Sequence, residues 1–163
     1  EYVPEDRLTE GLFLTQSIIR NVAIGRLDHH DNYGFLDLPS LFSDASKWSN
    51  RFKVKTPSVE APVQSLSGGN QQRVVLARWL ARAPLVLILN GPSVGVDVGS
   101  KSDIHDIIRD LASSGLGVVV ISDDLPELLT TCHRILVMRM GKIIDEVGAG
   151  TVTEEELSYK LAS

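Results

Sequence analysis

The chain has 163 residues and a formal net charge of −5, with 43% hydrophobic and 23% charged residues. This length and composition are typical of one globular domain with a hydrophobic core. The negative charge gives no electrostatic basis for binding nucleic acid, so no nucleic-acid partner is expected. The one cysteine, Cys132, excludes an internal disulfide and fits a reducing, cytosolic setting. The longest apolar runs are too short to span a bilayer.

The first forty residues predict a strand end, a short helix and a loop. Tyr2-Val3 reads as the end of a strand, and Ser17 is a plausible N-cap for a helix that runs to Ile24. Residues 28–39 are rich in His, Asp, Asn and Gly, which predicts a surface loop. The pair His29-His30 has no second group of ligands at suitable spacing, so no metal site is expected there.

Two longer helices follow in this half of the chain. Residues 41–52 carry their apolar side chains on one face, which predicts an amphipathic helix. A second helix is predicted from Gln71 to Arg82, because Pro84 ends its apolar pattern. Its three arginines are expected on a solvated face or in ion pairs: Arg73, Arg78 and Arg82.

The second half alternates strands and helices. The apolar runs Leu85–Leu89 and Gly117–Ile121 predict strands buried on both faces, which is typical of a parallel α/β sheet. Asp97 is expected to start a long helix that stops at Gly115. A short helix, a β-hairpin and a last helix with an acidic first turn follow, over residues 125–131, 135–146 and 153 onward.

The stretch Leu66-Ser67-Gly68-Gly69-Asn70-Gln71-Gln72-Arg73 leads straight into the second long helix. The first turn of a helix has N–H groups without intrahelical partners and a partial positive charge, and glycines let a ligand approach the backbone. This pattern predicts an anion site, most naturally for phosphate. The alternative is an ordinary helix start capped by Ser67 or Asn70.

Four features stand in a fixed order: Leu66–Arg73, an apolar strand, Gly91–Asp97, and a strand ending at Ser122-Asp123. Over essentially the whole chain, this order resembles the ATP-binding cassette (ABC) ATPases, a branch of the P-loop NTPases. In this resemblance Ser67-Gly68-Gly69 matches the ABC signature, residues 85–91 the Walker B strand, Val96-Asp97 the D-loop and Ser122-Asp123 the switch position.

The signature continues as Asn70-Gln71-Gln72, and this sequence resembles the signature in the second nucleotide-binding half of ribose-type monosaccharide importers. Those halves carry Pro-Glu-Asp-Arg or a close variant at the Q-loop position, as Pro4-Glu5-Asp6-Arg7 do here. The resemblance implies one partial ABC ATPase domain over residues 1–163. A helical signature subdomain would cover about 15–82, and the remaining core subdomain 1–14 and 83–163.

The resemblance also implies a mechanism. Two cassettes pack head to tail, and the hydroxyl of Ser67, the amides of Gly68 and Gly69, and Gln71 would act on ATP held by the partner cassette. Closing and reopening of the pair would drive transmembrane permease subunits. The protein would then be cytoplasmic and peripheral on the inner face of the plasma membrane.

The chain departs from the family pattern in two ways. A P-loop requires Gly-x-x-x-x-Gly-Lys-Ser/Thr, but the one Gly-Lys pair, Gly141-Lys142, is followed by Ile143. The chain is therefore expected to be the C-terminal portion of a cassette, without Walker A. The Walker B strand ends in Asn90-Gly91 instead of Asp-Glu, which removes the charge that supports Mg²⁺ and the carboxylate that polarises water. Asp123 stands where many cassettes have the switch histidine.

These departures lead to several expectations. ATP and Mg²⁺ would be held mainly by the missing segment or by the partner, so the isolated chain is expected neither to bind ATP tightly nor to hydrolyse it. In the family's sheet, the P-loop strand lies between the strand ending at Ser122 and the hairpin. Its absence predicts a gap, with self-association through the exposed edges or a displaced hairpin.

Three functions are compatible with the sequence. The leading one is part of the ATP-binding subunit of a sugar importer, an ABC-type ATPase by resemblance. The second is a non-catalytic interaction module or decayed cassette, which Asn90-Gly91 favours. A soluble cassette ATPase of repair or translation is third, and the spellings at Pro4–Arg7 and Asn70–Gln72 count against it.

Overall fold

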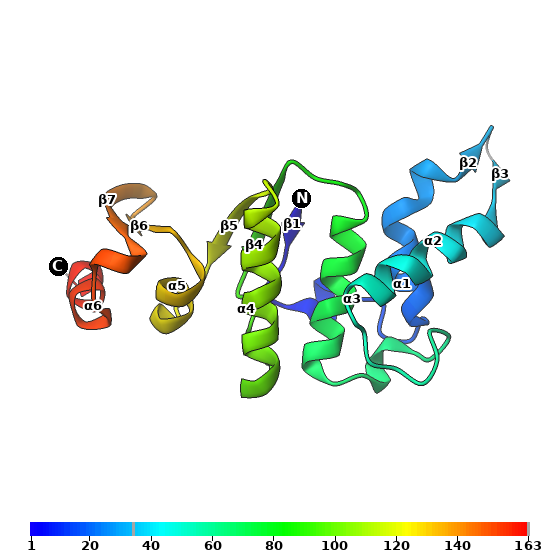
Figure 1. Ribbon diagram of the computed structural model, residues 1–163, viewed down its shortest axis with the longest axis horizontal. Helices are drawn as coiled ribbons and strands as arrows, with labels where there is room; N and C mark the ends of the chain where they lie inside the picture. The colour runs from blue at the N-terminus through cyan, green and yellow to red at the C-terminus, as the bar shows by residue number, and fades with distance from the viewer. Residues whose placement is uncertain (34, 163) are drawn as a thin grey trace.

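The computed structural model describes residues 1–33 and 35–162. Figure 1 shows an elongated molecule in which a helical part, a small sheet and a C-terminal hairpin follow one another along the long axis. The four longer helices are α2 (Leu38–Arg51), α3 (Gly68–Leu80), α4 (Val98–Ser113) and α6 (Glu154–Ala162). The predicted helices after Ser17, over 41–52, 71–82 and from Asp97 are therefore confirmed, with α1 (Ile18–Ala23) as the first.

The central sheet is parallel and has three described strands in the order β1-β4-β5 (Tyr2–Val3, Val86–Asn90 and Gly117–Ile121). Its register pairs Tyr2 with Ile88 and Asn90 with Ile121. The β-branched composition of β4 and β5 favours strands, and the helical crossover between them, α4, makes their pairing parallel.

The prediction that β4 and β5 are buried on both faces is wrong for this structure. Leu87 and Leu89 are fully buried against the helices, whereas the side chains on the opposite face of the sheet remain open. Val119 and Ile121 on β5 are 48% and 49% exposed, because the described helices cover only one face of the strands. The strands β4 and β5 therefore carry apolar side chains that the described part of the chain does not cover.

A second, separate sheet is the hairpin of β6 (Arg134–Arg139) and β7 (Lys142–Gly148), with an irregular register between Val137 and Met138. It is not hydrogen-bonded to β5, and it packs with α5 (Leu125–Thr131) and α6 around a small core of its own. An incomplete parallel sheet followed by a C-terminal hairpin was expected from the sequence, and the structure confirms this α/β architecture.

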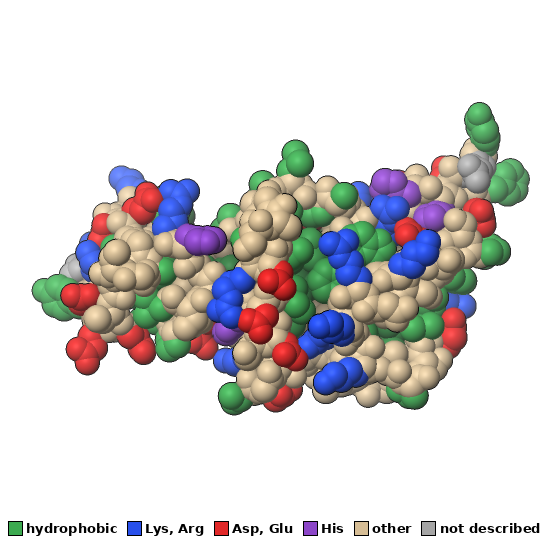
Figure 2. Space-filling view, viewed as in Figure 1, with side chains coloured by type: hydrophobic (Ala, Val, Ile, Leu, Met, Phe, Trp, Pro, Cys, Tyr) green, Lys and Arg blue, Asp and Glu red, His purple; other side chains and the backbone are tan. Residues whose placement is uncertain are grey.

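The region predicted as a surface loop over residues 28–39 contains more structure than expected. The 3-10 helix η2 (Ile24–His29) is followed by a small antiparallel hairpin, β2 (Asp31–Asn32) and β3 (Phe35–Leu36). Gly34 of the predicted loop lies outside the described residues. Two-residue strands are too short to show an alternating pattern, which is why the sequence did not indicate them. Hydrophobic side chains project from the tip of this hairpin (Figure 2), and Tyr33 is fully exposed.

Two of the three arginines that were predicted on a solvated face or in ion pairs are buried in the structure. Arg78 is only 6% exposed and donates to the carbonyl oxygens of Gly11 and Asn21 at 2.6 and 2.7 Å. Arg73 is also buried, and it bonds Asp103 on α4 at 2.5 Å. The prediction is wrong for Arg78, because α3 runs through the middle of the helical part and has no free face there; Arg73 is buried as well, but it forms one of the predicted ion pairs. Arg82 is exposed and pairs with acidic side chains, as predicted.

Candidate functional site

The start of α3 is the first element of the site. Ser67 is its N-cap in extended backbone conformation, but its side chain makes no capping hydrogen bond. The hydroxyl is instead held by the Asn70 amide at 3.0 Å, and the Asn70 oxygen accepts from the Lys55 backbone N–H at 2.8 Å. Ser67 is exposed at the start of this 13-residue helix, whose first turn has no side-chain cap, although Gly69 and Gln71 within that turn are buried. Such a turn is suited to an anion.

The two glycines of this stretch are required by packing. A Cβ on Gly68 would lie 2.5 Å from the Gly95 carbonyl oxygen, and a Cβ on Gly69 would lie 2.5 Å from the Ser100 side chain. No side chain fits at these distances, so the glycines let α3 approach the loop before α4. From the sequence, we expected these glycines to give a ligand access to the backbone. In the structure, they are required by the close approach of α3 to the loop before α4.

The loop before α4 ends at Asp97, which is the N-cap of that helix. Its carboxylate accepts from the Ser100 backbone N–H at 3.0 Å, and this hydrogen bond lowers the pKa of Asp97. Ser100 is also the residue against which Gly69 packs. The D-loop position and the signature position therefore share one contact region.

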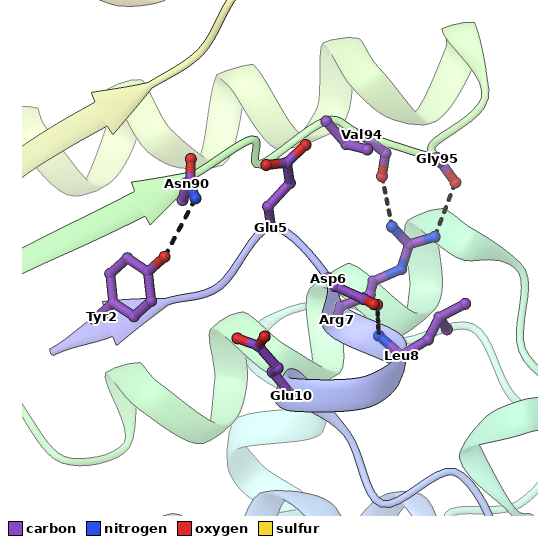
Figure 3. A pocket seen from close by; sticks show the side chains of 9 residues that line it. All are labelled: Tyr2, Glu5, Asp6, Arg7, Leu8, Glu10, Asn90, Val94 and Gly95. Carbon is purple, nitrogen blue, oxygen red and sulfur yellow. Dashed lines mark hydrogen bonds between the residues drawn. The ribbon is translucent and has the colours of Figure 1, made fainter.

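The end of β4 forms the second element of the site, with β1 and the segment after it. The Asn90 amide donates to the Tyr2 hydroxyl at 3.2 Å. Gly91 has a left-handed φ of +55°, and a Cβ there would lie 2.9 Å from the Cγ atom of Glu5 and from a methyl group of Val94. Glu5 thus occupies the space beside Gly91, and its carboxylate points toward the loop after β4 (Figure 3).

An open cavity of about 470 Å³ lies between these elements, lined in part by Tyr2, Glu5, Arg7 and Asn90. Pro4, beside Glu5 in the sequence, is buried. Among the described residues no group of three His, Cys, Asp or Glu side chains could hold a metal ion. Because Asn90 is neutral and its amide points to Tyr2, the side chains at this strand end do not fit a Mg²⁺ site.

The end of β5 forms the third element. The Ser122 hydroxyl donates to the buried Glu127 carboxylate at 2.5 Å, and the His105 ring nitrogen lies 3.0 Å from the other Glu127 oxygen. Asp124 caps α5 and accepts from Lys101 at 3.2 Å, so α4 holds this turn through two side chains. Asp123 itself is exposed.

The structure brings together most, but not all, of the residues that the sequence singled out. Glu5 and Asn90 line one cavity, and Gly91 packs against Glu5. Gly68, Gly69 and Asp97 lie where the starts of α3 and α4 approach each other. Gln71 is buried and donates to the Val63 carbonyl at 3.4 Å, so its side chain faces the interior. The structure thus gives the positions of these residues, and their roles in nucleotide binding stay predictions.

The sequence placed Arg7 in the motif at the Q-loop position but gave no indication of its contacts. Arg7 follows the cavity segment and reaches the carbonyl oxygens of Val94 and Gly95, at 2.5 and 2.8 Å (Figure 3). An arginine in a charged stretch normally remains in solvent, so the residues around Arg7 do not indicate that its side chain is buried against this loop.

The sequence profile of the ABC transporter family matches residues 2–94, which is more than half of the chain. The chain belongs to the ABC transporter family. It is 44% identical to the L-arabinose transport ATP-binding protein AraG of Geobacillus stearothermophilus, over 96% of this chain and 30% of that protein. It is 45% identical to the ribose import ATP-binding protein RbsA of Rhodococcus jostii, over 96% of this chain and 31% of that protein.

The chain therefore spans about a third of the length of these curated relatives. Two solved structures share its fold. One is the ATP-binding cassette MJ0796 in a dimeric post-hydrolysis state bound to ADP and Pi, with a TM-score of 0.73 and 22% identity over 93% of this chain and 63% of that one. The other is an inward-facing, putative metal-chelate type ABC transporter, with a TM-score of 0.78 and 19% identity over 97% of this chain and 62% of that one. No described helix is long and apolar enough to cross a membrane.

Proposed function

We propose that this chain is part of the ATP-binding subunit of a monosaccharide importer, and that the start of α3 acts on ATP held by a partner cassette. The observation that carries this proposal is the exposed Ser67 hydroxyl at the uncapped start of α3, held there by the Asn70 amide. The relatives support the substrate class, since their names describe arabinose, ribose and xylose transport.

The proposal assigns the partners and the location. A second cassette, in the same or a linked chain, would hold ATP and Mg²⁺ against α3, and transmembrane permease subunits would receive the resulting motion. The subunit would lie on the inner face of the plasma membrane. This arrangement agrees with the neutral side chains at the end of β4, because the anion site on α3 requires no metal ligand from this chain.

Turnover at this chain's own strand end is proposed to be weak. General-base help contributes about 10²- to 10⁴-fold in rate, and Gly91 has no side chain that could supply it. The hydrolysis that drives transport would then take place on the nucleotide that α3 faces. Asn90 and Asp123, at the Walker B and switch positions, would support structure more than chemistry.

Ser67 provides the test, because its side chain is exposed and does not cap the helix. In the full-length subunit assembled with its permease and sugar-binding protein, S67A should lower sugar-stimulated ATP hydrolysis by about tenfold or more, as loss of one anion-stabilising donor does. The matched control is S65A, since Ser65 is also exposed and bonds only the Pro62 carbonyl. Equal rates for wild type and S67A would refute the proposed role of α3.

A further inference from the structure

Arg7 joins three segments that are far apart in the sequence. It starts the π-helix η1 (Arg7–Gly11), and its two terminal nitrogens donate to consecutive carbonyl groups, those of Val94 and Gly95. Figure 3 shows the guanidinium group reaching from the segment after β1 to the loop between β4 and α4. These two carbonyl groups lie just before the D-loop position at Val96-Asp97.

The same group also lies against the start of α3. A Cβ on Gly68 would be 2.8 Å from Arg7 Nη2 and 2.5 Å from the Gly95 carbonyl oxygen. The guanidinium, the Gly95 carbonyl and the first residue of α3 are thus in mutual contact. Gly95 has a left-handed φ of +66°, and a Cβ there would lie 3.2 Å from Arg7 Nη2, so a side chain at this position would crowd the guanidinium.

The environment of Arg7 distinguishes it from an ordinary structural arginine. The residue is 8% exposed, and its Nε atom is buried without a hydrogen-bond partner. Burial lowers the pKa of the Arg7 guanidinium, while the neighbouring Asp6 carboxylate opposes this shift. An apolar side chain would fill the same space without the cost of burying a charge, so the arginine is suited to hold two carbonyl groups in a fixed arrangement.

We infer that Arg7 is a positioning residue that fixes the D-loop and the start of α3 relative to residues 4–11. A displacement of residues 4–11 is then passed directly to both segments that face the partner cassette. This inference rests on the proposed function, because only a nucleotide held against α3 gives that displacement an effect on ATP turnover. Arg7 itself touches no nucleotide in this arrangement.

The experiment compares R7M and R7K with R20M in the full-length subunit, assembled with its permease and sugar-binding protein in proteoliposomes. R20M is the matched control, because Arg20 is exposed and its side chain bonds only Gln16, in the bend before α1. The steady-state constants for ATP are measured with and without sugar, together with hydrogen exchange at residues 67–70 and 94–97.

R7M is expected to change the KM for ATP by less than about twofold and to lower the sugar-stimulated kcat by about 10- to 100-fold, since a small misplacement of the reacting geometry costs rate rather than binding. Exchange should increase by about tenfold in both segments and stay unchanged in α1. R7K should recover part of the rate, because its ammonium group can reach one of the two carbonyl groups.

Two results would overturn the inference. One is a wild-type kcat and wild-type exchange in R7M. The other is exchange that rises throughout the protein equally in R7M and R7K, which would reduce Arg7 to a general structural role. If the wild-type assembly shows no sugar-stimulated hydrolysis, the proposed function fails, and the exchange at residues 67–70 and 94–97 still decides whether Arg7 holds these segments.

Discussion

Replacement of Arg78 by methionine should strongly destabilise the fold. Arg78 donates to Gly11, to the Asn21 carbonyl and to the Asn21 side chain at 2.6, 2.7 and 2.5 Å, and its guanidinium lies 5.3 Å from the centre of the Phe13 ring. Burial lowers the pKa of this arginine to about 10. The charge is therefore poorly solvated and satisfied almost entirely by these oxygen atoms.

The magnitude follows from the groups that would lose their donor. In R78M two buried carbonyl oxygens, those of Gly11 and Asn21, lose the guanidinium, at about 1–3 kcal/mol each. Removal of the buried charge offsets part of this loss, so the expected decrease in the free energy of unfolding is about 2–5 kcal/mol. Lysine at this position would keep the charge but lose the three-way geometry, so R78K should not restore stability.

Urea denaturation followed by fluorescence of Trp48 and Trp79 measures this loss. R20M is the control, because Arg20 is exposed and its loss should change the free energy of unfolding by no more than about 0.5 kcal/mol. A difference between R78M and wild type below about 1 kcal/mol would refute the reasoning, since unsatisfied buried carbonyl groups cost at least that much.

Three further predictions concern the strand ends and caps. G91A should lower the free energy of unfolding by about 1–3 kcal/mol more than G115A, because both glycines have positive φ but only Gly91 has side chains against its Cβ position; equal losses in thermal melts would contradict this. Asp97 has a lowered pKa, so its contribution is complete above its unfolded pKa of about 3.9 and is lost as the pH falls through the native value. D97N should therefore flatten the decline of urea-measured stability below about pH 4, and an unchanged decline would count against the cap. The half-exposed Ile121 lies on the open edge strand, so I121K should reduce self-association in sedimentation velocity, whereas Y159K on α6 should not.

Local patterns in the sequence predicted most of the elements. The periodicity of α2 and α4, the caps at Ser17 and Asp97 and the hairpin predicted over residues 135–146 are each determined by neighbouring residues, and the structure has them where they were expected. The signature and D-loop positions are short contiguous motifs, so the sequence alone could locate them, and their roles stay predictions.

The errors concern properties that depend on distant residues. Whether Arg78 faces solvent depends on Gly11 and Asn21, which approach it only in the folded chain. The same holds for Arg7, whose partners are 87 and 88 residues away. The half-exposed face of β5 could not be predicted either, because the sequence pattern of an apolar strand does not depend on whether other elements cover both of its faces.

The burial of α3 has a consequence for how the protein unfolds. Its residues from Gln71 to Arg78 are all buried, and its apolar ones share a single core with Val3 and Leu89 of the sheet and Ile104 of α4. Residues 1 to 121 should therefore lose their structure in one cooperative step. The C-terminal hairpin shares with α5 and α6 a separate core in which four of the described hydrophobic residues are buried, so it should open at a lower free energy and exchange its amides first.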